Sequence, residues 1–449
     1  MTKAAFESGR ILNIPGSKGH TLNAIALALK ADRELTIKNP HPKVDLDKYR
    51  AIIGSRGFKA EYDGDDLALK KIESDYEGSQ PVALFDLDDP IALLAAISFK
   101  LPVRFLLEEN EDFERKFLIL RRLGVEFGSV RKVNDKNAVA MESFNPVKVK
   151  FNFQESNFYL ANYIGLICAV CGLETEFLSK IDVVKPLAEH LFPFSLSLEN
   201  LRKAVDETDE LEKRLRKLQK HRPEENSHYR IKGVSLDLPD RVSLPADPFM
   251  TALAAVIAAI DSEEDAIIGP LMESEGEKTF AKILTKLGLA CDFYKHLYED
   301  GAELSFFKVG SGRLSGRKIE EHLMRAFIEG FGALAVLASF ADDKTILRGL
   351  PSSSSLWQSR ISGVADILST AGIRIGEVED GFVIEPPAER GDIVCREFDD
   401  PYLQLIQLAA GLLINEKPLT TEFFQPISRY PHFKGIIDKF RPRSKSLAS

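Results

Sequence analysis

The sequence contains little cysteine and no long apolar segment. Only four cysteines occur among 449 residues, so the disulfide framework of small secreted domains is not indicated. No run of 18 or more apolar residues is present, and therefore no segment is a candidate for a membrane-spanning helix. The first residues also lack the pattern of a secretory signal peptide. We expect a cytoplasmic protein that does not bind a membrane.

Excess basic charge and metal-ligand patterns are missing as well. The formal net charge is −9 at pH 7, which disfavours binding to nucleic acid. The eight histidines are scattered without the spacing of a metal site, so neither a metal nor another cofactor is expected. Cys168 and Cys171 form a C-x-x-C pair inside an apolar segment. Buried core thiols explain this pair better than a redox or zinc site does.

The chain has instead a small-residue helical pattern that recurs six times. Each stretch is apolar nearly all round and rich in Ala or Gly, which predicts a helix that is buried on every side. The six stretches are 21–30, 89–98, 157–170, 247–260, 328–340 and 401–414. Six buried helices can direct six positively polarised N-termini toward a ligand, and this favours an anionic, phosphorylated small molecule.

A second pattern, an amphipathic helix that ends at glycine before a strand, occurs four times. The glycines are Gly57, Gly124, Gly288 and Gly372, each suited to a left-handed helix end. After two of them the segments 61–71 and 377–385 read as hairpins with Asp-Gly at the turn. The sequence therefore predicts an α/β repeat protein, with ordinary α/β alternation as the alternative.

Two segments depart from these patterns. Residues 198–225 carry leucines near helical spacing among many Glu and Lys residues, which predicts a charged helical insertion on the surface. A partner-binding or dimer-forming helix over 198–220 is the alternative. The C-terminal segment 435–449 ends in a basic, Ser-rich stretch and is expected to be disordered.

The first candidate for chemistry is Lys18. It follows a short strand and a Pro-Gly-Ser turn, and it stands where the first buried helix begins. Backbone N–H groups and an ammonium group can bind one anion together at such a place.

Around this lysine and in three further segments, the chain resembles the 5-enolpyruvylshikimate-3-phosphate (EPSP) synthase family. These enzymes transfer an enolpyruvyl group from phosphoenolpyruvate to shikimate 3-phosphate. The similar segments are 15–23 (PGSKGHTLN), 346–385, 399–412 and 428–433. The resemblance implies an α/β fold in the form of a two-lobed inside-out α/β barrel. It has six βαβαββ repeats, three in each lobe, and a ligand cleft between the lobes.

The lobe boundaries follow from the same resemblance. Lobe 1 is expected to combine residues 1–17 with 241–434, and lobe 2 to span 18–240 with the charged insertion inside it.

The resemblance also assigns roles to individual residues. Lys18 matches the family's anion-binding lysine, and Arg360 matches the arginine that contacts a carboxylate or phosphate. Glu329 stands where the family has an aspartate that acts as acid and base. Ser156 matches a serine that binds the substrate's phosphate, and Asn157 replaces the polar residue beside it.

Other site positions are altered. Trp357 follows Leu356, and the two replace a glutamate and a lysine; Trp357 either stacks on a ring-shaped ligand or fills the vacated space. Tyr402 replaces an arginine, Ser352 can bond an oxyanion in place of an asparagine, and Arg429 lies beside a lost C-terminal lysine.

The loss of three or four cations bears directly on function. Charge-assisted hydrogen bonds contribute about 1.5–3 kcal/mol each, so even about 5 kcal/mol weakens phosphoenolpyruvate binding several thousand-fold. The sequence therefore predicts a divergent EPSP-synthase-like transferase that acts on a cyclic hydroxylated or phosphorylated small molecule. Two alternatives stay open: a non-catalytic ligand-binding or regulatory protein of the same fold, and a distant but functional 3-phosphoshikimate 1-carboxyvinyltransferase.

Overall fold

The computed structural model describes most of the chain in two compact units. One unit combines Met1–Ser17 with Pro245–Ser449 (unit 1), and the other is Lys18–Leu244 (unit 2). The described residues are 10–73, 83–108, 111–147, 150–153, 167, 175–179, 227–231, 238–261, 265–272, 275–297, 303–310, 312–350, 355–416, 418–428 and 431–439. Among them, no helix has the length and apolarity that crossing a membrane requires.

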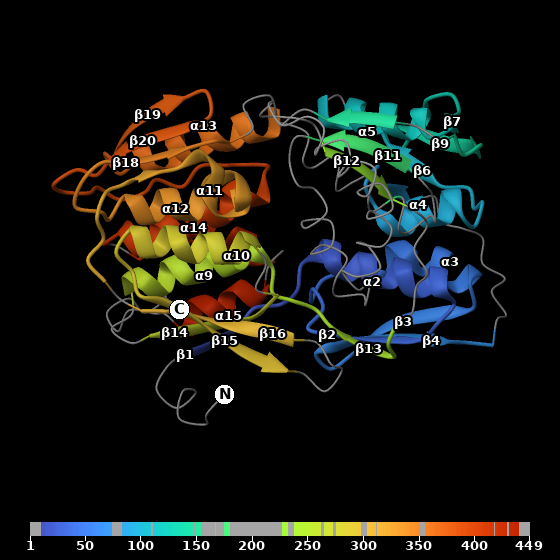
Figure 1. Cartoon of the computed structure of the whole chain (residues 1–449), viewed down its shortest axis with the longest axis horizontal. Helices are drawn as coiled ribbons and strands as arrows, with labels where there is room; N and C mark the ends of the chain where they lie inside the picture. The colour runs from blue at the N-terminus through green and yellow to red at the C-terminus, as the bar shows by residue number, and fades with distance from the viewer. Residues whose placement is uncertain are drawn as a thin grey trace, which may run out of the picture. The chain divides into compact units, whose positions relative to one another are not determined.

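Unit 1 contains two four-stranded sheets with helices between them (Figure 1). The strands, in sheet order, are β1 (Arg10–Asn13), β14 (Ala266–Leu271), β16 (Glu303–Val309) and β15 (Cys291–Leu297), then β17 (Lys318–Ile319), β18 (Thr345–Arg348), β20 (Gly381–Glu385) and β19 (Arg374–Val378). The helices are α9 (Pro248–Asp261), α10 (Glu275–Lys286), α11 (Glu321–Ala326), η3 (Ile328–Gly330), α12 (Phe331–Ala338), α13 (Ser355–Ser369), α14 (Pro401–Ile414), η4 (Thr421–Ser428) and α15 (Pro431–Lys439).

Unit 2 has the same kind of construction. Its described strands, sheet by sheet, are β13 (Arg241–Ser243), β2 (Leu35–Lys38), β4 (Asp66–Lys71) and β3 (Phe58–Asp63); β5 (Leu84–Phe85), β6 (Arg104–Leu106), β9 (Lys136–Phe144) and β7 (Val125–Phe127), with β8 (Arg131–Val133) also on β9; and β10 (Lys150–Phe153), β11 (Thr175–Ser179) and β12 (Ser227–Ile231). Its described helices are α2 (Lys18–Ala31), α3 (Leu46–Ser55), α4 (Pro90–Ile97) and α5 (Glu111–Arg122).

One pairing pattern recurs in the sheets. In each of the four larger sheets, the first two strands of the order given above pair in parallel, and the remaining neighbours pair antiparallel. The chain is thus a mixed α/β protein, as predicted, and the number of six repeats stays a prediction.

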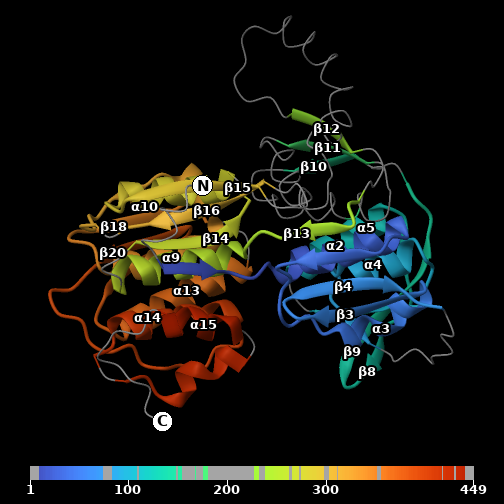
Figure 2. The ribbon, with the colours of Figure 1, turned by 90° about the horizontal axis from the view of Figure 1, so that it is seen from below.

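Two sheets borrow their first strand from a distant part of the chain. Strand β1 pairs with β14, and β13 pairs with β2 (Figures 1 and 2). Each of these two sheets therefore joins strands that lie far apart in the sequence. Residues 241–243 pair with β2 and therefore belong to unit 2. Unit 2 ends at Leu244, four residues after residue 240, where lobe 2 was expected to end.

The predicted buried helices form where the structure describes them. The eight residues of α4 and the eight of α12 are all buried, and α9, α12 and α14 pack on one another in the core of unit 1. Their small side chains allow this because helix axes approach closely only where side chains are short. The stretch 157–170, which includes Cys168, lies outside the described residues except for Ile167, as do Cys171 and the insertion 198–225.

The helix-ending glycines are confirmed. All have positive φ: Gly57 (72°), Gly124 (99°), Gly288 (104°) and Gly372 (75°). A strand follows each of them, and the hairpins β3–β4 and β19–β20 form as predicted.

The expectation of a disordered segment 435–449 is wrong for its first five residues. They belong to α15, whose Phe433, Ile436 and Ile437 are buried in the core of unit 1. Their apolar spacing anchors the helix, whereas residues 440–449 lie outside the described part.

Candidate functional site

Five of the nine predicted site residues fall in the described part of the chain. Lys18 lies in unit 2, whereas Glu329, Trp357, Arg360 and Tyr402 lie in unit 1. The other four, Ser156, Asn157, Ser352 and Arg429, lie outside the described residues, and their roles stay predictions.

The unit 1 residues come together because each stands at or beside the beginning of a helix. Trp357 and Arg360 are one turn apart on α13 and so share a face. Tyr402 is in the first turn of α14, and Glu329 is in the short helix η3 before α12. Phe249, in the first turn of α9, stacks on the Tyr402 ring with 4.5 Å between the ring centroids. We call this set the helix-start cluster.

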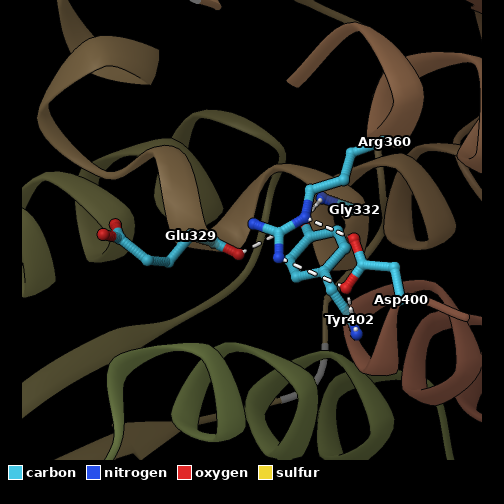
Figure 3. A network of polar contacts seen from close by, with 5 residues as sticks. All are labelled: Glu329, Gly332, Arg360, Asp400 and Tyr402. Atoms are coloured by element: carbon cyan, nitrogen blue, oxygen red, sulfur yellow. Dashed lines mark hydrogen bonds and ion pairs between the residues drawn. The ribbon is translucent and has the colours of Figure 1, made fainter. Parts of the chain in front are cut away.

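Arg360 is paired inside the helix-start cluster (Figure 3). Its Nε lies 2.7 Å from Oδ2 of Asp400 and its Nη2 lies 3.3 Å from Oδ1, with each side chain about 20% exposed. The guanidinium carbon also lies 5.0 Å from the Trp357 ring centroid and 4.4 Å from that of Tyr402. The positive charge of Arg360 is therefore largely compensated by this chain's own groups.

Tyr402 connects two parts of the backbone. Its hydroxyl accepts a hydrogen bond from the Gly332 N–H (2.8 Å) and donates one to the Glu329 carbonyl (3.3 Å) (Figure 3). Burial is the main factor that raises the pKa of Tyr402. A Cβ at Gly332 would lie 2.9 Å from the hydroxyl oxygen, so glycine is required for this close approach.

Trp357 is only 4% exposed, and its ring meets that of Tyr402 edge to face, with 6.0 Å between the centroids. Since little of the indole surface is open, the packing favours the space-filling interpretation over stacking on a ligand.

Glu329 takes part in this cluster through its backbone, while its carboxyl group points away from Arg360 and Tyr402 (Figure 3). Burial raises the pKa of the Glu329 carboxyl, and the charges of Asp247 and Glu277 raise it further. Arg360 acts in the opposite direction and lowers the pKa. A carboxyl group in such surroundings retains its proton to higher pH than an exposed glutamate does.

At four of the buried helices, side chains of the chain itself accept hydrogen bonds from N–H groups of the first turn. At α4, Asp89 accepts from the N–H groups of Ile91 (3.1 Å) and Ala92 (3.0 Å). Asp247 accepts from Met250 N (2.9 Å) at α9, Asp400 from Tyr402 N (3.0 Å) at α14, and the Tyr402 hydroxyl from Gly332 at α12.

The sequence carried a signal for three of these caps. Asp89, Asp247 and Asp400 are each followed by proline, and Asp-Pro at a helix start is a strong capping signature. The aspartate caps were therefore predictable, whereas the Tyr402 cap, which comes from another helix, was not.

Two of the acids near α4 have structural partners. Asp89 accepts a hydrogen bond from the Tyr49 hydroxyl at 2.7 Å, and Asp88 pairs with Lys116 at 2.7 Å. Burial raises the pKa of Asp89, and burial together with the Asp89 charge raises that of Tyr49. These acids stabilise unit 2 and place negative charge beside α4.

Lys18 is the first residue of α2, is exposed, and has no acidic residue in its helix turn. Close to it, His41 is 9% exposed, and burial with the Lys18 charge lowers the pKa of His41 to about 4. His41 is therefore neutral near pH 7, and its Nδ1 accepts from the Lys43 N–H (3.2 Å). Sequence analysis missed His41, which the fold alone brings beside α2 through its N–H bond to Thr21 Oγ1 (2.9 Å).

Within the described part of the chain, no group of three or more His, Cys, Asp or Glu residues is arranged to hold a metal ion.

Solved structures with a similar fold include an EPSP synthase and an enolpyruvyl transferase. EPSP synthase from Acinetobacter baumannii has a TM-score of 0.69 and 16% identity, covering 97% of this chain and 96% of that chain. The enolpyruvyl transferase NikO from Streptomyces tendae has a TM-score of 0.59 and 16% identity, covering 91% and 89%. The chain therefore has the fold of the enolpyruvyl transferases.

Sequence comparison leads to the same family over shorter stretches, although no family model matches the chain. The 3-phosphoshikimate 1-carboxyvinyltransferase of Sphingopyxis alaskensis is 23% identical over 215 residues, 47% of this chain and 48% of that protein. The corresponding protein of Rhodopseudomonas palustris is 26% identical over 145 residues, 32% and 33% of the two chains. The matched part thus spans about half or less of these curated relatives. The chain is a distant relative of the EPSP synthase and enolpyruvyl transferase family, which confirms the resemblance found in the sequence.

Proposed function

We propose that this chain is a divergent transferase with the enolpyruvyl transferase fold, which acts on a cyclic hydroxylated or phosphorylated small molecule. The observation that carries the proposal is the environment of Glu329. It is a half-buried glutamate whose carboxyl group has a raised pKa, and it lies at the start of a buried helix. A carboxyl group whose pKa is raised by burial is suited to give and take a proton during group transfer.

Lys18 supplies the second part of the proposal. An exposed ammonium group at the start of α2, together with the backbone N–H groups there, is suited to a phosphate or carboxylate of the substrate. The family's ligand cleft between two lobes stays part of this proposal.

Ordinary EPSP synthesis is not what we propose. Phosphoenolpyruvate carries close to three negative charges, and Arg360 is already paired with Asp400 while Tyr402 brings no charge. Each missing charge-assisted hydrogen bond weakens binding by about 1.5–3 kcal/mol. NikO, an enolpyruvyl transferase, shares this fold at 16% identity.

Two alternatives keep specific support. The chain's own caps on four helices favour a non-catalytic protein that binds or senses a small molecule. The similarity to 3-phosphoshikimate 1-carboxyvinyltransferases supports a distant but functional enzyme of that kind. Fold and distant similarity alone do not decide among them.

The deciding experiment measures turnover of a panel of cyclic hydroxylated and phosphorylated compounds, with shikimate 3-phosphate plus phosphoenolpyruvate included. We expect no turnover with shikimate 3-phosphate and turnover with another cyclic alcohol, reduced by about 10²- to 10⁴-fold in Glu329→Gln. Glu321→Gln is the matched control, because Glu321 is an exposed glutamate on neighbouring α11. Turnover with shikimate 3-phosphate would support the ordinary enzyme. Binding without turnover for every acceptor would support the non-catalytic alternative.

A further inference from the structure

The start of α12 already has a ligand from its own chain. The residue at the helix start, Gly330, has no side chain that could cap α12. The Gly332 N–H donates instead to the Tyr402 hydroxyl at 2.8 Å. The hydroxyl proton points to the Glu329 carbonyl, so a lone pair of the oxygen faces the amide. An anion that binds a helix start needs such an amide, and here it is available only if Tyr402 moves.

The same tyrosine covers Arg360. Its ring centroid lies 4.4 Å from the guanidinium carbon, and its backbone N–H donates to Asp400 Oδ1, the oxygen that also bonds Arg360 Nη2. The ring is itself held by Phe249 at 4.5 Å and is only 6% exposed. Three parts of one residue, its amide, ring and hydroxyl, therefore hold the Arg360–Asp400 pair and the α12 start in place.

The charges nearby act in the same direction. Asp247 and Glu277 lie close enough to Glu329 to raise its pKa. Asp400 carries a further negative charge, which is paired with the positive charge of Arg360. An incoming phosphate or carboxylate at Arg360 would meet the negative charge of Asp400 and a cation that is already bonded.

From these contacts we infer that Tyr402 is a specificity-determining residue, which excludes small anions from Arg360 and from the start of α12. A phosphate group of the ligand accordingly has to be bound elsewhere. This inference deepens the proposed function and rests on it for the nature of the ligand. Its test needs binding only, so the two can fail separately.

The test uses the full chain, inorganic phosphate as the probe and the fluorescence of Trp357 as the readout. Trp357 is the only tryptophan and lies 5.0 Å from the Arg360 guanidinium carbon, so it reports an anion that reaches this arginine. In the wild-type chain we expect no saturable change of emission. Tyr402→Arg, which adds a cation and removes the hydroxyl acceptor, should bind phosphate at least about tenfold more tightly than wild type.

A matched control comes from unit 2. The Tyr62 hydroxyl likewise accepts from an N–H, that of Val44 (3.1 Å), and donates to a carbonyl, that of His41 (2.6 Å). Tyr62→Arg adds the same charge elsewhere and should leave the response of Trp357 to phosphate unchanged. If Tyr402→Arg does not fold, Tyr402→Gln uncovers Arg360 without added charge and should still give a saturable response.

Two results would overturn the inference. One is a saturable response of wild-type Trp357 with a Kd below about 1 mM, because phosphate would then reach Arg360 past Tyr402. The other is a folded Tyr402→Arg or Tyr402→Gln chain that binds phosphate no better than wild type.

Discussion

Removal of a single hydroxyl group, in Tyr402→Phe, should destabilise unit 1 by about 2 kcal/mol. The hydroxyl accepts a short hydrogen bond from Gly332 N (2.8 Å) and donates a long one to Glu329 O (3.3 Å). Because Tyr402 is 6% exposed, water has little access to the vacated position. A buried N–H without a partner costs about 1–3 kcal/mol, and the longer bond adds little.

Urea unfolding followed by Trp357 emission measures this loss. The only tryptophan lies in unit 1, with its ring 6.0 Å from the Tyr402 ring, and therefore reports on that unit. For a slope of about 2 kcal/mol per M, the midpoint should fall by about 1 M urea. Tyr62→Phe removes a comparable hydroxyl from unit 2 and should leave the Trp357 transition in place.

A small shift would refute this reasoning. If the midpoint of Tyr402→Phe falls by less than about 0.25 M, the loss is under about 0.5 kcal/mol. The hydroxyl would then not serve as the cap of α12, and the inferred specificity role would lose its structural basis.

Three further predictions concern other residues of the two units. Gly332→Ala places a Cβ 2.7 Å from Ile406 and should lower the free energy of unfolding, measured with urea, by about 1–3 kcal/mol. Gly435→Ala is the control, because no atom lies within 4 Å of its Cβ, and it should be neutral or stabilising. Equal effects of the two substitutions would contradict the packing argument. Asp89→Ala removes the α4 cap and the hydrogen-bond partner of Tyr49, and it should destabilise unit 2 by about 2 kcal/mol or more. Urea unfolding followed by circular dichroism measures this loss as a lower midpoint. An unchanged midpoint would argue against the cap. Since the folded-state pKa of Glu329 is raised, wild-type stability falls as pH rises from the unfolded value through the folded one. Glu329→Gln should therefore stabilise the chain at pH 8 and have little effect below about pH 4, and a pH-independent difference in urea midpoint would contradict this.

Much of the fold could be predicted from local patterns. The buried helices follow from stretches of small apolar residues, and the four helix ends follow from glycines that only the left-handed conformation explains. The hairpins follow from Asp-Gly between alternating residues, as at Gly64. These features depend on neighbours within a few residues, so the order of amino acids specifies them.

The candidate site was predicted only in part. Arg360 and Tyr402 were expected as ligand contacts, and this stays a prediction; the structure adds that Arg360 pairs with Asp400 and that Tyr402 bonds the start of α12. The Asp-Pro pair before α14 indicated a cap, but the second role of Asp400 as the partner of Arg360 had no local signal.

The sequence by itself determined the helices, their glycine ends, the hairpins and the distant resemblance to the EPSP synthase family. Only the tertiary structure decided which charges are compensated and which helix starts are occupied. The physical reason is the separation of the partners: Arg360 and Asp400 are 40 residues apart and Gly332 and Tyr402 are 70 apart. No periodicity covers such distances, and the contacts arise only when α12, α13 and α14 pack together in one core.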